Sequence, residues 1–151
     1  MSGSYAVEAI AGAGFDWLMI DTEHSPNDLE SVLTQLQIVA AYPTQPVVRV
    51  PWNDMVTIKR YLDIGAQTLL IPQVNSADEA KAAVSYTRYP PTGLRGVGGT
   101  TRATRFGRVN GYAQSAQSEI CVIVQVESQQ ALDDIEGLPH PPNAIRRMHR
   151  L

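Results

Sequence analysis

Residues 47–71, VVRVPWNDMVTIKRYLDIGAQTLLI, decide the fold class of this chain. The segment opens and closes with short apolar runs, 47–50 and 68–71, of the kind that form buried strands. Residues 55–64 between them have a helical period, and Gly65 supplies the C-terminal stop of that helix. A strand, a helix and a second strand in this order predict a βαβ unit with parallel strands.

The alternation of strands and helices continues on both sides of this unit. About four βα units can be counted, which predicts an α/β fold built on a parallel sheet. Because the strands are almost entirely apolar, we expect both faces of the sheet to be buried. Further strands are predicted at 17–20 and 120–124, and further helices at 6–13, 28–41, 77–86 and from Ser128 onward.

The composition is that of an ordinary globular domain, with 44% hydrophobic and 18% charged residues among 151. A net charge of -3 gives no broad attraction to nucleic acid. No stretch approaches the roughly 18 consecutive apolar residues of a membrane span, and residues 1–5 do not begin a signal peptide. The single cysteine, Cys121, lies in an apolar run, which indicates a buried thiol in a reducing compartment. These observations predict a cytoplasmic protein without nucleic-acid or membrane partners.

Two segments depart from the alternation. Residues 89–111 are rich in Gly, Pro, Thr and Arg, and the run 93–99 lacks the spacing of a phosphate-binding loop. Loops of this length are usually functional or disordered, and we interpret this one as a mobile loop at the mouth of a substrate site. After Gly137 the chain becomes rich in proline and arginine, and the alternation stops. We therefore predict a domain at 1–137 and a divergent tail at 138–151.

Polar residues follow the predicted strands directly, where catalytic groups collect in α/β barrels. Asp21 stands three residues before His24, close enough to orient the imidazole of a general base. The alternative, that His24 packs against the following turn while Asp21 binds backbone, stays open. The full set of candidates is Asp21, Glu23, His24, Arg49, Gln73, Gln125 and Glu127.

Arg49 lies inside an apolar strand, where its guanidinium must be paired or must face a polar cavity. One interpretation is a fork that binds a carboxylate or an oxyanion, and the other is an internal ion pair with Asp21, Glu23 or Glu127. Glu127 ends the last predicted strand and offers oxygen ligands of the kind that Mg²⁺ or Mn²⁺ prefers. One carboxylate alone does not make a metal site.

Five segments, taken together, resemble the HpcH/HpaI aldolase family, and the resemblance runs in order over about residues 5–137. It implies a partial (β/α)8 TIM barrel and a class II aldolase, which is a carbon–carbon lyase that depends on Mg²⁺, Mn²⁺ or Co²⁺. The implied reaction is the reversible cleavage of 4-hydroxy-2-oxo acids to pyruvate and an aldehyde, without a Schiff-base lysine. The segments are 11–17 (AGAGFDW), 20–24 (IDTEH), 47–54 (VVRVPWND), 89–98 (YPPTGLRGVG) and 124–127 (VQVE).

The resemblance also implies roles for particular residues. His24 matches the catalytic base, with Asp21 beside it, and Arg49 matches the residue that binds pyruvate and stabilises its enolate. Glu127 matches one metal-binding carboxylate, and Gln125 lines the same site. The family's second metal-binding carboxylate, on a Gly-Pro-Ala-Asp stretch, has no counterpart here. The family further implies a homo-oligomer.

The first strand and the last three strands of the family's barrel have no counterpart either, so we expect a piece of a barrel that is complete at about 250 residues. Two functional interpretations stay open: an aldolase whose active form needs the missing parts, and an inactive fragment that acts as a binding or interaction module. A third, an open α/β domain that binds a small molecule, is disfavoured by the exposed apolar edge strands that it would have.

Overall fold

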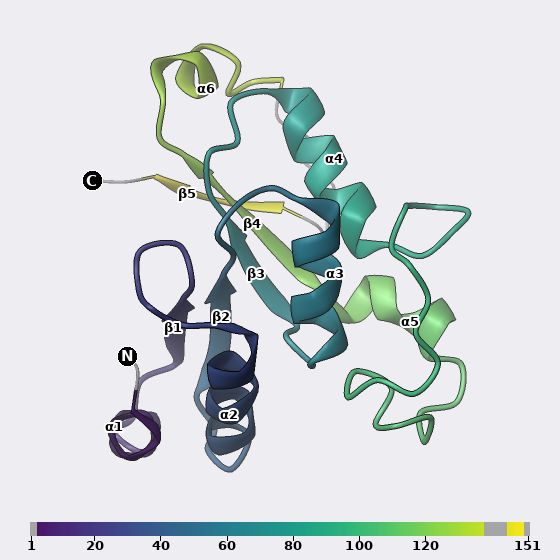
Figure 1. Cartoon of the computed structure of the whole chain (residues 1–151). Helices are drawn as coiled ribbons and strands as arrows, with labels where there is room; N and C mark the ends of the chain where they lie inside the picture. Colours follow the sequence, from purple (N-terminus) through teal and green to yellow (C-terminus); the bar gives the residue numbers. More distant parts are fainter. Residues whose placement is uncertain (1–2, 138–144, 150–151) are drawn as a thin grey trace.

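The structure is a computed structural model that describes residues 3–137 and 145–149. Its centre is an open sheet of parallel strands whose spatial order is their order in the sequence (Figure 1). The predicted α/β class with four parallel strands is confirmed, and a fifth strand extends the sheet. The strands are β1 (Trp17–Asp21), β2 (Gln45–Arg49), β3 (Thr68–Ile71), β4 (Cys121–Val126) and β5 (Ile145–His149).

Most helices begin where a polar side chain caps the first turn. In α2, α3, α4 and α6 the capping side chain accepts a hydrogen bond from the backbone N–H three residues further on, which satisfies an otherwise unpaired donor. The caps are Asp28, Asp54, Ser76 and Ser128. The helices are α1 (Ser4–Ala11), α2 (Leu29–Val39), α3 (Met55–Asp63), α4 (Ala77–Thr87), α5 (Tyr112–Glu119) and α6 (Gln129–Asp133).

Two elements were not predicted from the sequence. Helix α5 has the polar sequence YAQSAQSE and buries only Ala116, so it carries no apolar periodicity. Strand β5, with the sequence IRRMH, lies in the segment predicted as a divergent tail and pairs in parallel with β4. It lacks the apolar run by which the other strands were recognised. The domain boundary at residue 137 stays a prediction.

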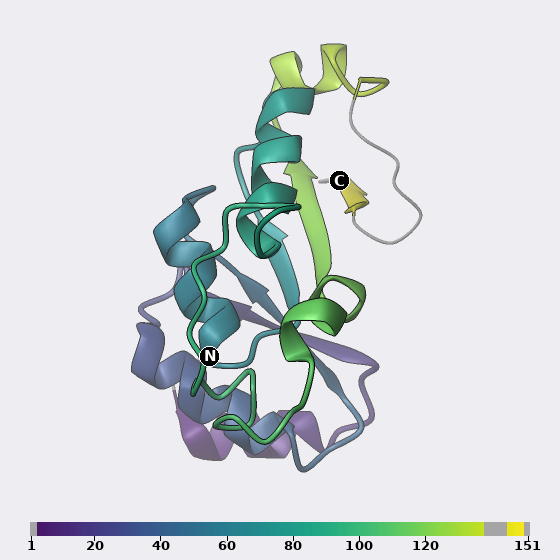
Figure 2. The same ribbon diagram turned by 90° about the vertical axis from the view of Figure 1, so that its right-hand side faces the viewer.

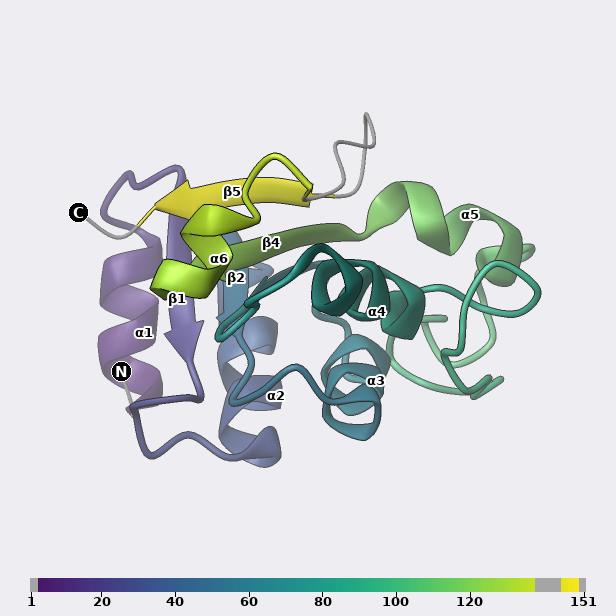
Figure 3. The same ribbon diagram turned by 90° about the horizontal axis from the view of Figure 1, so that it is seen from above.

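The core lies between the helices and one face of the sheet (Figure 3). Alternate strand residues, such as Ile20, Val48 and Leu69, point to this face and are at most 1% exposed. A smaller cluster joins Val7 of α1 to Leu18 of β1. Each such aliphatic side chain contributes about 1.5–3 kcal/mol of burial free energy, so this face holds the sheet and the helices together.

The opposite face is only partly covered, so the prediction that both faces are buried was wrong. Trp17 is 48% exposed, and Cys121, predicted to be buried, is also partly accessible. A cavity of about 400 Å³ lies here between Trp17, Val47, Leu70 and other residues. Because side chains alternate along a strand, the face that carries Trp17 also carries Asp21.

Among the described residues, no helix is both long enough and apolar enough to cross a membrane.

Candidate active site

The carboxyl ends of the first four strands bring the predicted site residues to one edge of the sheet. Asp21 and Arg49 are the last residues of β1 and β2, and they are Cα partners in the parallel register. Gln73 follows β3, and Glu127 follows β4. Residues far apart in the sequence are thus neighbours, as expected for an edge where parallel strands end together.

The centre of the site is an ion pair between Arg49 and two carboxylates. Arg49 Nε donates to Asp21 Oδ1 at 2.8 Å, and Nη2 donates to Asp21 Oδ2 at 2.7 Å. Its third nitrogen, Nη1, lies 3.2 Å from Oε2 of Glu23. The three side chains are only 11–14% exposed, so the charges are largely removed from water.

The pairing shifts the proton affinities of both partners. The hydrogen bond from Arg49 holds the pKa of the Asp21 carboxyl far below its ordinary value of 3.8, more than compensating the opposing effect of burial. The same hydrogen bond raises the pKa of Arg49, with smaller contributions from the charges of Glu23 and Glu127. Both groups therefore stay charged throughout the physiological pH range.

Asp21 organises the loop that follows it and does not orient an imidazole. Its Oδ1 accepts hydrogen bonds from the backbone N–H groups of Glu23 (3.0 Å) and His24 (3.4 Å), and its Oδ2 accepts one from Ser25 Oγ at 3.3 Å. The predicted pair between Asp21 and the His24 ring is therefore absent in the described structure. Arg49 takes both oxygens of Asp21 because a bidentate guanidinium pair is stronger than a single bond to an imidazole.

His24 instead has Glu23 as its nearest carboxylate. Its Nε2 lies 3.5 Å from Glu23 Oε1, and its side chain is 64% exposed at the rim of the site. Glu23 thus stands between His24 and Arg49, with one oxygen toward each. The base that the sequence predicts is accessible to a molecule entering from solvent.

Glu127 is held in place from two directions. Its Oε1 accepts a hydrogen bond from the backbone N–H of Gln73 at 2.8 Å, and its Oε2 accepts one from Gln125 Nε2 at 3.3 Å. Gln73 has a φ of +54°, in the left-handed region that a non-glycine residue rarely adopts, and this conformation costs about 1–3 kcal/mol. In this strained conformation, the backbone N–H of Gln73 donates to the Glu127 carboxylate.

The donor set at this edge fits part of a hard-cation site. Glu127 supplies a carboxylate, and Oε1 of Gln125 is a buried amide oxygen without a hydrogen-bond partner among the side chains that the structure describes. Oxygen donors of these two kinds suit Mg²⁺ or Mn²⁺. Within residues 3–137, however, no group of three or more His, Cys, Asp and Glu side chains could hold an ion by itself.

Two successive hydrogen bonds between polar groups behind Asp21 were not predicted from the sequence. Asn27 donates to the carbonyl oxygen of Asp21 at 2.7 Å, and Gln35 donates to Oδ1 of Asn27 at 2.9 Å. Gln35 is 3% exposed and lies on the apolar face of α2 beside Val32 and Leu36. The sequence did contain a signal for these hydrogen bonds. Gln35 occupies a position of the helical period that is otherwise apolar, and a buried amide needs a hydrogen-bond partner.

The glycine-rich segment does not lie at the mouth of this site in the described chain, which overturns its interpretation as a mouth loop. It packs against the C-terminal turn of α3, at the amino end of the sheet, and runs beside α5 away from α6 (Figure 2). Arg95, fully buried, fixes it there by pairing with Asp63 at 3.1 Å and stacking over the ring of Tyr89 at 4.5 Å.

A parallel sheet whose strands follow one another in sequence order, with its helices on one face and its charged groups at the carboxyl ends, is typical of α/β barrels, and this chain forms a part of one. The family model described as HpcH/HpaI aldolase/citrate lyase matches residues 2–142. The chain belongs to this family.

Curated relatives carry the name 4-hydroxy-2-oxo-heptane-1,7-dioate aldolase. The protein of Escherichia coli is 54% identical over 145 residues, which covers 91% of this chain and 55% of the relative. The protein of Salmonella dublin is 55% identical over 139 residues, with 91% and 53% covered. The chain therefore spans about half the length of these relatives.

Solved structures of the family share the fold. An HpcH/HpaI aldolase/citrate lyase family protein from Burkholderia cenocepacia superposes with a TM-score of 0.92 at 44% identity, over 97% of this chain and 60% of that one. The HpcH/HpaI aldolase from Desulfitobacterium hafniense gives a TM-score of 0.82 at 30% identity, over 98% and 58%. The described strands and helices therefore correspond to a part of those folds.

Proposed function

We propose that this chain carries the pyruvate-binding and proton-transferring part of a class II aldolase that cleaves 4-hydroxy-2-oxo acids to pyruvate and an aldehyde. One observation carries the proposal: the guanidinium of Arg49 is held by Asp21 and Glu23 on the same edge of the sheet as Glu127. A fixed positive charge can bind the oxygens of a small oxo acid, and a fixed carboxylate beside it can hold a divalent cation that binds the same oxygens.

In the cleavage direction, the hydroxyl group at C4 of the substrate loses its proton, and the bond between C3 and C4 breaks. The aldehyde leaves, the electron pair passes into the enolate of pyruvate, and C3 then takes up a proton. Arg49 neutralises the developing enolate oxygen, and the clamp by two carboxylates fixes its position before the substrate arrives.

His24 is the group that moves the proton. Its ring is exposed at the rim, and an imidazole can accept or donate a proton at a ring nitrogen, as a general base or acid must. In this proposal Asp21 acts through Arg49 and through the loop backbone.

A divalent cation, Mg²⁺, Mn²⁺ or Co²⁺, would be held by Glu127, with Gln125 lining the same position. When bound, it supplies positive charge to the carboxylate and keto oxygens of pyruvate. Cytoplasmic location and homo-oligomerisation belong to the same proposal.

A second candidate is an inactive fragment that only binds or interacts. The observation that favours it is the completeness of the ion pair, because the three nitrogens of Arg49 already have Asp21 and Glu23 as partners. An internal ion pair of this kind needs no substrate.

Pyruvate release from 4-hydroxy-2-oxo-heptane-1,7-dioate tests both. The full chain is assayed with each cation and again after chelation, beside the variants Arg49→Lys and Glu127→Gln and the control Arg60→Lys on the exposed side of α3. Metal-dependent release that both site variants abolish supports the aldolase. No release from folded protein supports the binding module, and full activity after chelation contradicts the metal proposal.

A further inference from the structure

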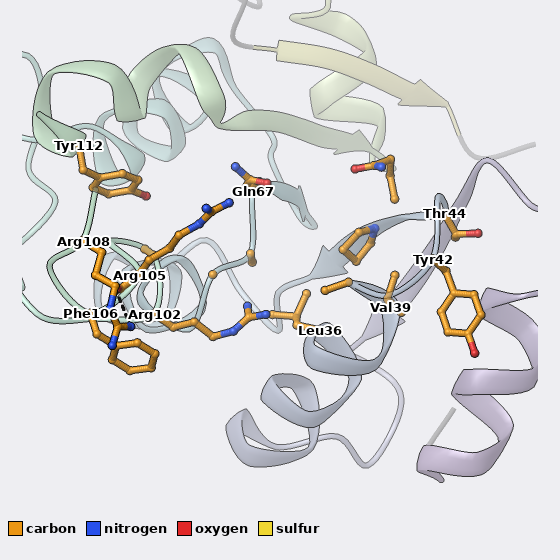
Figure 4. Close-up of a pocket in the computed structure, with 16 residues that line it drawn as sticks. Leu36, Val39, Tyr42, Thr44, Gln67, Arg102, Arg105, Phe106, Arg108 and Tyr112 are labelled. Carbon is orange, nitrogen blue, oxygen red and sulfur yellow. Dashed lines mark hydrogen bonds between the residues drawn. The ribbon is translucent and has the colours of Figure 1, made fainter. Parts of the chain in front are cut away.

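A second cavity, of about 630 Å³, opens at the amino-terminal end of β2 and β3, away from the candidate active site. One wall is formed by α2 and the residues that lead into these strands, and the other by the turn at residues 102–108 (Figure 4). Its lining contains three arginines, Arg102, Arg105 and Arg108, and none of the described residues that line it is acidic. We call it the arginine cavity.

These three positive charges have no anionic partner in the part of the chain that the structure describes. Arg102 donates to the carbonyl oxygen of Ile64 at 2.9 Å, and Arg108 donates to the carbonyl oxygen of Arg105 at 3.4 Å. For the Arg105 side chain no hydrogen bond to a described residue is found. Figure 4 shows the side chain of Arg102 extending toward Leu36. The charges repel one another, and an anion between them would relieve the repulsion.

The turn that presents the arginines is rigidly built. Thr104, only 7% exposed, donates through its hydroxyl to the carbonyl oxygen of Thr101 at 2.9 Å and accepts from the backbone N–H of Gly107 at 3.0 Å. Arg105 and Phe106 both have left-handed backbones, with φ of 49° and 58°. Strained backbones held by their surroundings are typical of ligand-binding segments. Because the turn is already ordered, binding would cost little conformational entropy.

We propose that the arginine cavity binds a small multivalent oxyanion, a molecule with at least two negative charges on phosphate or carboxylate groups. The guanidinium fork matches both groups, and three arginines line this cavity without an acidic residue among its described lining residues. A volume of about 630 Å³ accommodates an organic ligand and not just an inorganic ion. The apolar side chains of Leu36 and Val39 in the same lining would contact the uncharged part of such a ligand.

Calorimetric titration of the full chain with pyrophosphate, at constant ionic strength, tests the proposal. We expect saturable binding that Arg105→Gln weakens by about tenfold or more, because charge-assisted hydrogen bonds are lost. Arg60→Gln is the matched control, since Arg60 is an exposed arginine outside the cavity, and it should leave the affinity within about twofold. Arg49→Gln separates this cavity from the candidate active site and should also leave binding intact.

Circular dichroism checks that each variant folds, and Arg108→Gln, at an exposed position, replaces Arg105→Gln if the latter does not. A loss of affinity for pyrophosphate that is confined to the cavity variant supports the proposal. An equal loss in Arg60→Gln would show a general charge effect, and a loss in Arg49→Gln would place the anion in the other site. Either result, or the absence of saturable binding by the folded chain, overturns the proposal.

Discussion

The substitution Asp21→Asn tests the ion pair at the centre of the candidate site. The change keeps the size of the side chain and an acceptor oxygen but removes the negative charge that Arg49 faces. Because Arg49 and Asp21 are 11% and 14% exposed, the remaining guanidinium would be poorly solvated. The variant should therefore be less stable than the parent chain.

The size of the loss follows from the partners that remain. Breaking a buried ion pair by removing one partner costs about 3–5 kcal/mol. Here Glu23 stays 3.2 Å from Arg49 Nη1, and the amide oxygen of the variant still accepts one hydrogen bond. We therefore expect a loss of about 2–3 kcal/mol at pH 7, a large fraction of a typical free energy of unfolding of about 5–15 kcal/mol.

The loss should depend on pH in a defined direction. The pKa of Asp21 is lowered in the folded chain by its hydrogen bond from Arg49, relative to its ordinary value of 3.8, which holds in the unfolded chain. The ionised carboxylate therefore stabilises the fold fully above about pH 5 and loses this effect as the pH falls below about 4, toward the folded pKa. The variant lacks the group, so the difference between parent and variant should shrink in acid.

Urea unfolding followed by circular dichroism at pH 7, 5, 4 and 3 measures the difference. Asp16→Asn is the matched control, because Asp16 is an exposed carboxylate outside the ion pair, and it should change stability by less than about 0.5 kcal/mol. A difference for Asp21→Asn that stays constant down to pH 3, or one no larger than that of the control, would refute the reasoning.

Three further predictions concern the fold and the assembly. Leu69→Ala should cost about 2–5 kcal/mol in urea unfolding, because Leu69 is 0% exposed in the core, whereas Leu94→Ala, at a 60% exposed position, should cost less than about 0.5 kcal/mol. Ser128→Ala should cost about 1 kcal/mol in the same assay, because its hydroxyl caps α6 through the N–H of Ala131, and an unchanged midpoint would contradict the cap. The full chain should self-associate, because one face of the sheet leaves Trp17 48% exposed; a clean monomer in size-exclusion chromatography with light scattering would contradict this.

The alternation of strands and helices could be predicted because its signals are local. An apolar run, a helical period and a cap such as Ser76 each lie within a few residues of one another, and the structure has the expected strands and helices within a few positions. Helix α5 and strand β5 were missed because neither carries a sufficient apolar pattern of its own. Their form depends on what they pack or pair against, which a local pattern does not record.

The candidate site, too, was predictable from the sequence only in part. The sequence by itself placed Asp21, Arg49 and Glu127 at strand ends and required a partner for Arg49, because a charge inside an apolar strand cannot stay unpaired. Of the three candidate acids, Arg49 pairs with Asp21 and Glu23, and the register between β1 and β2 decides the stronger of these pairs because it makes Asp21 the Cα partner of Arg49. Because both oxygens of Asp21 accept from Arg49, the carboxylate beside the His24 imidazole is that of Glu23. The polarity of a position, and whether it is buried, can be predicted from the residue itself and its near neighbours in the sequence. Contacts between strands, in contrast, depend on how segments far apart in the chain align in space.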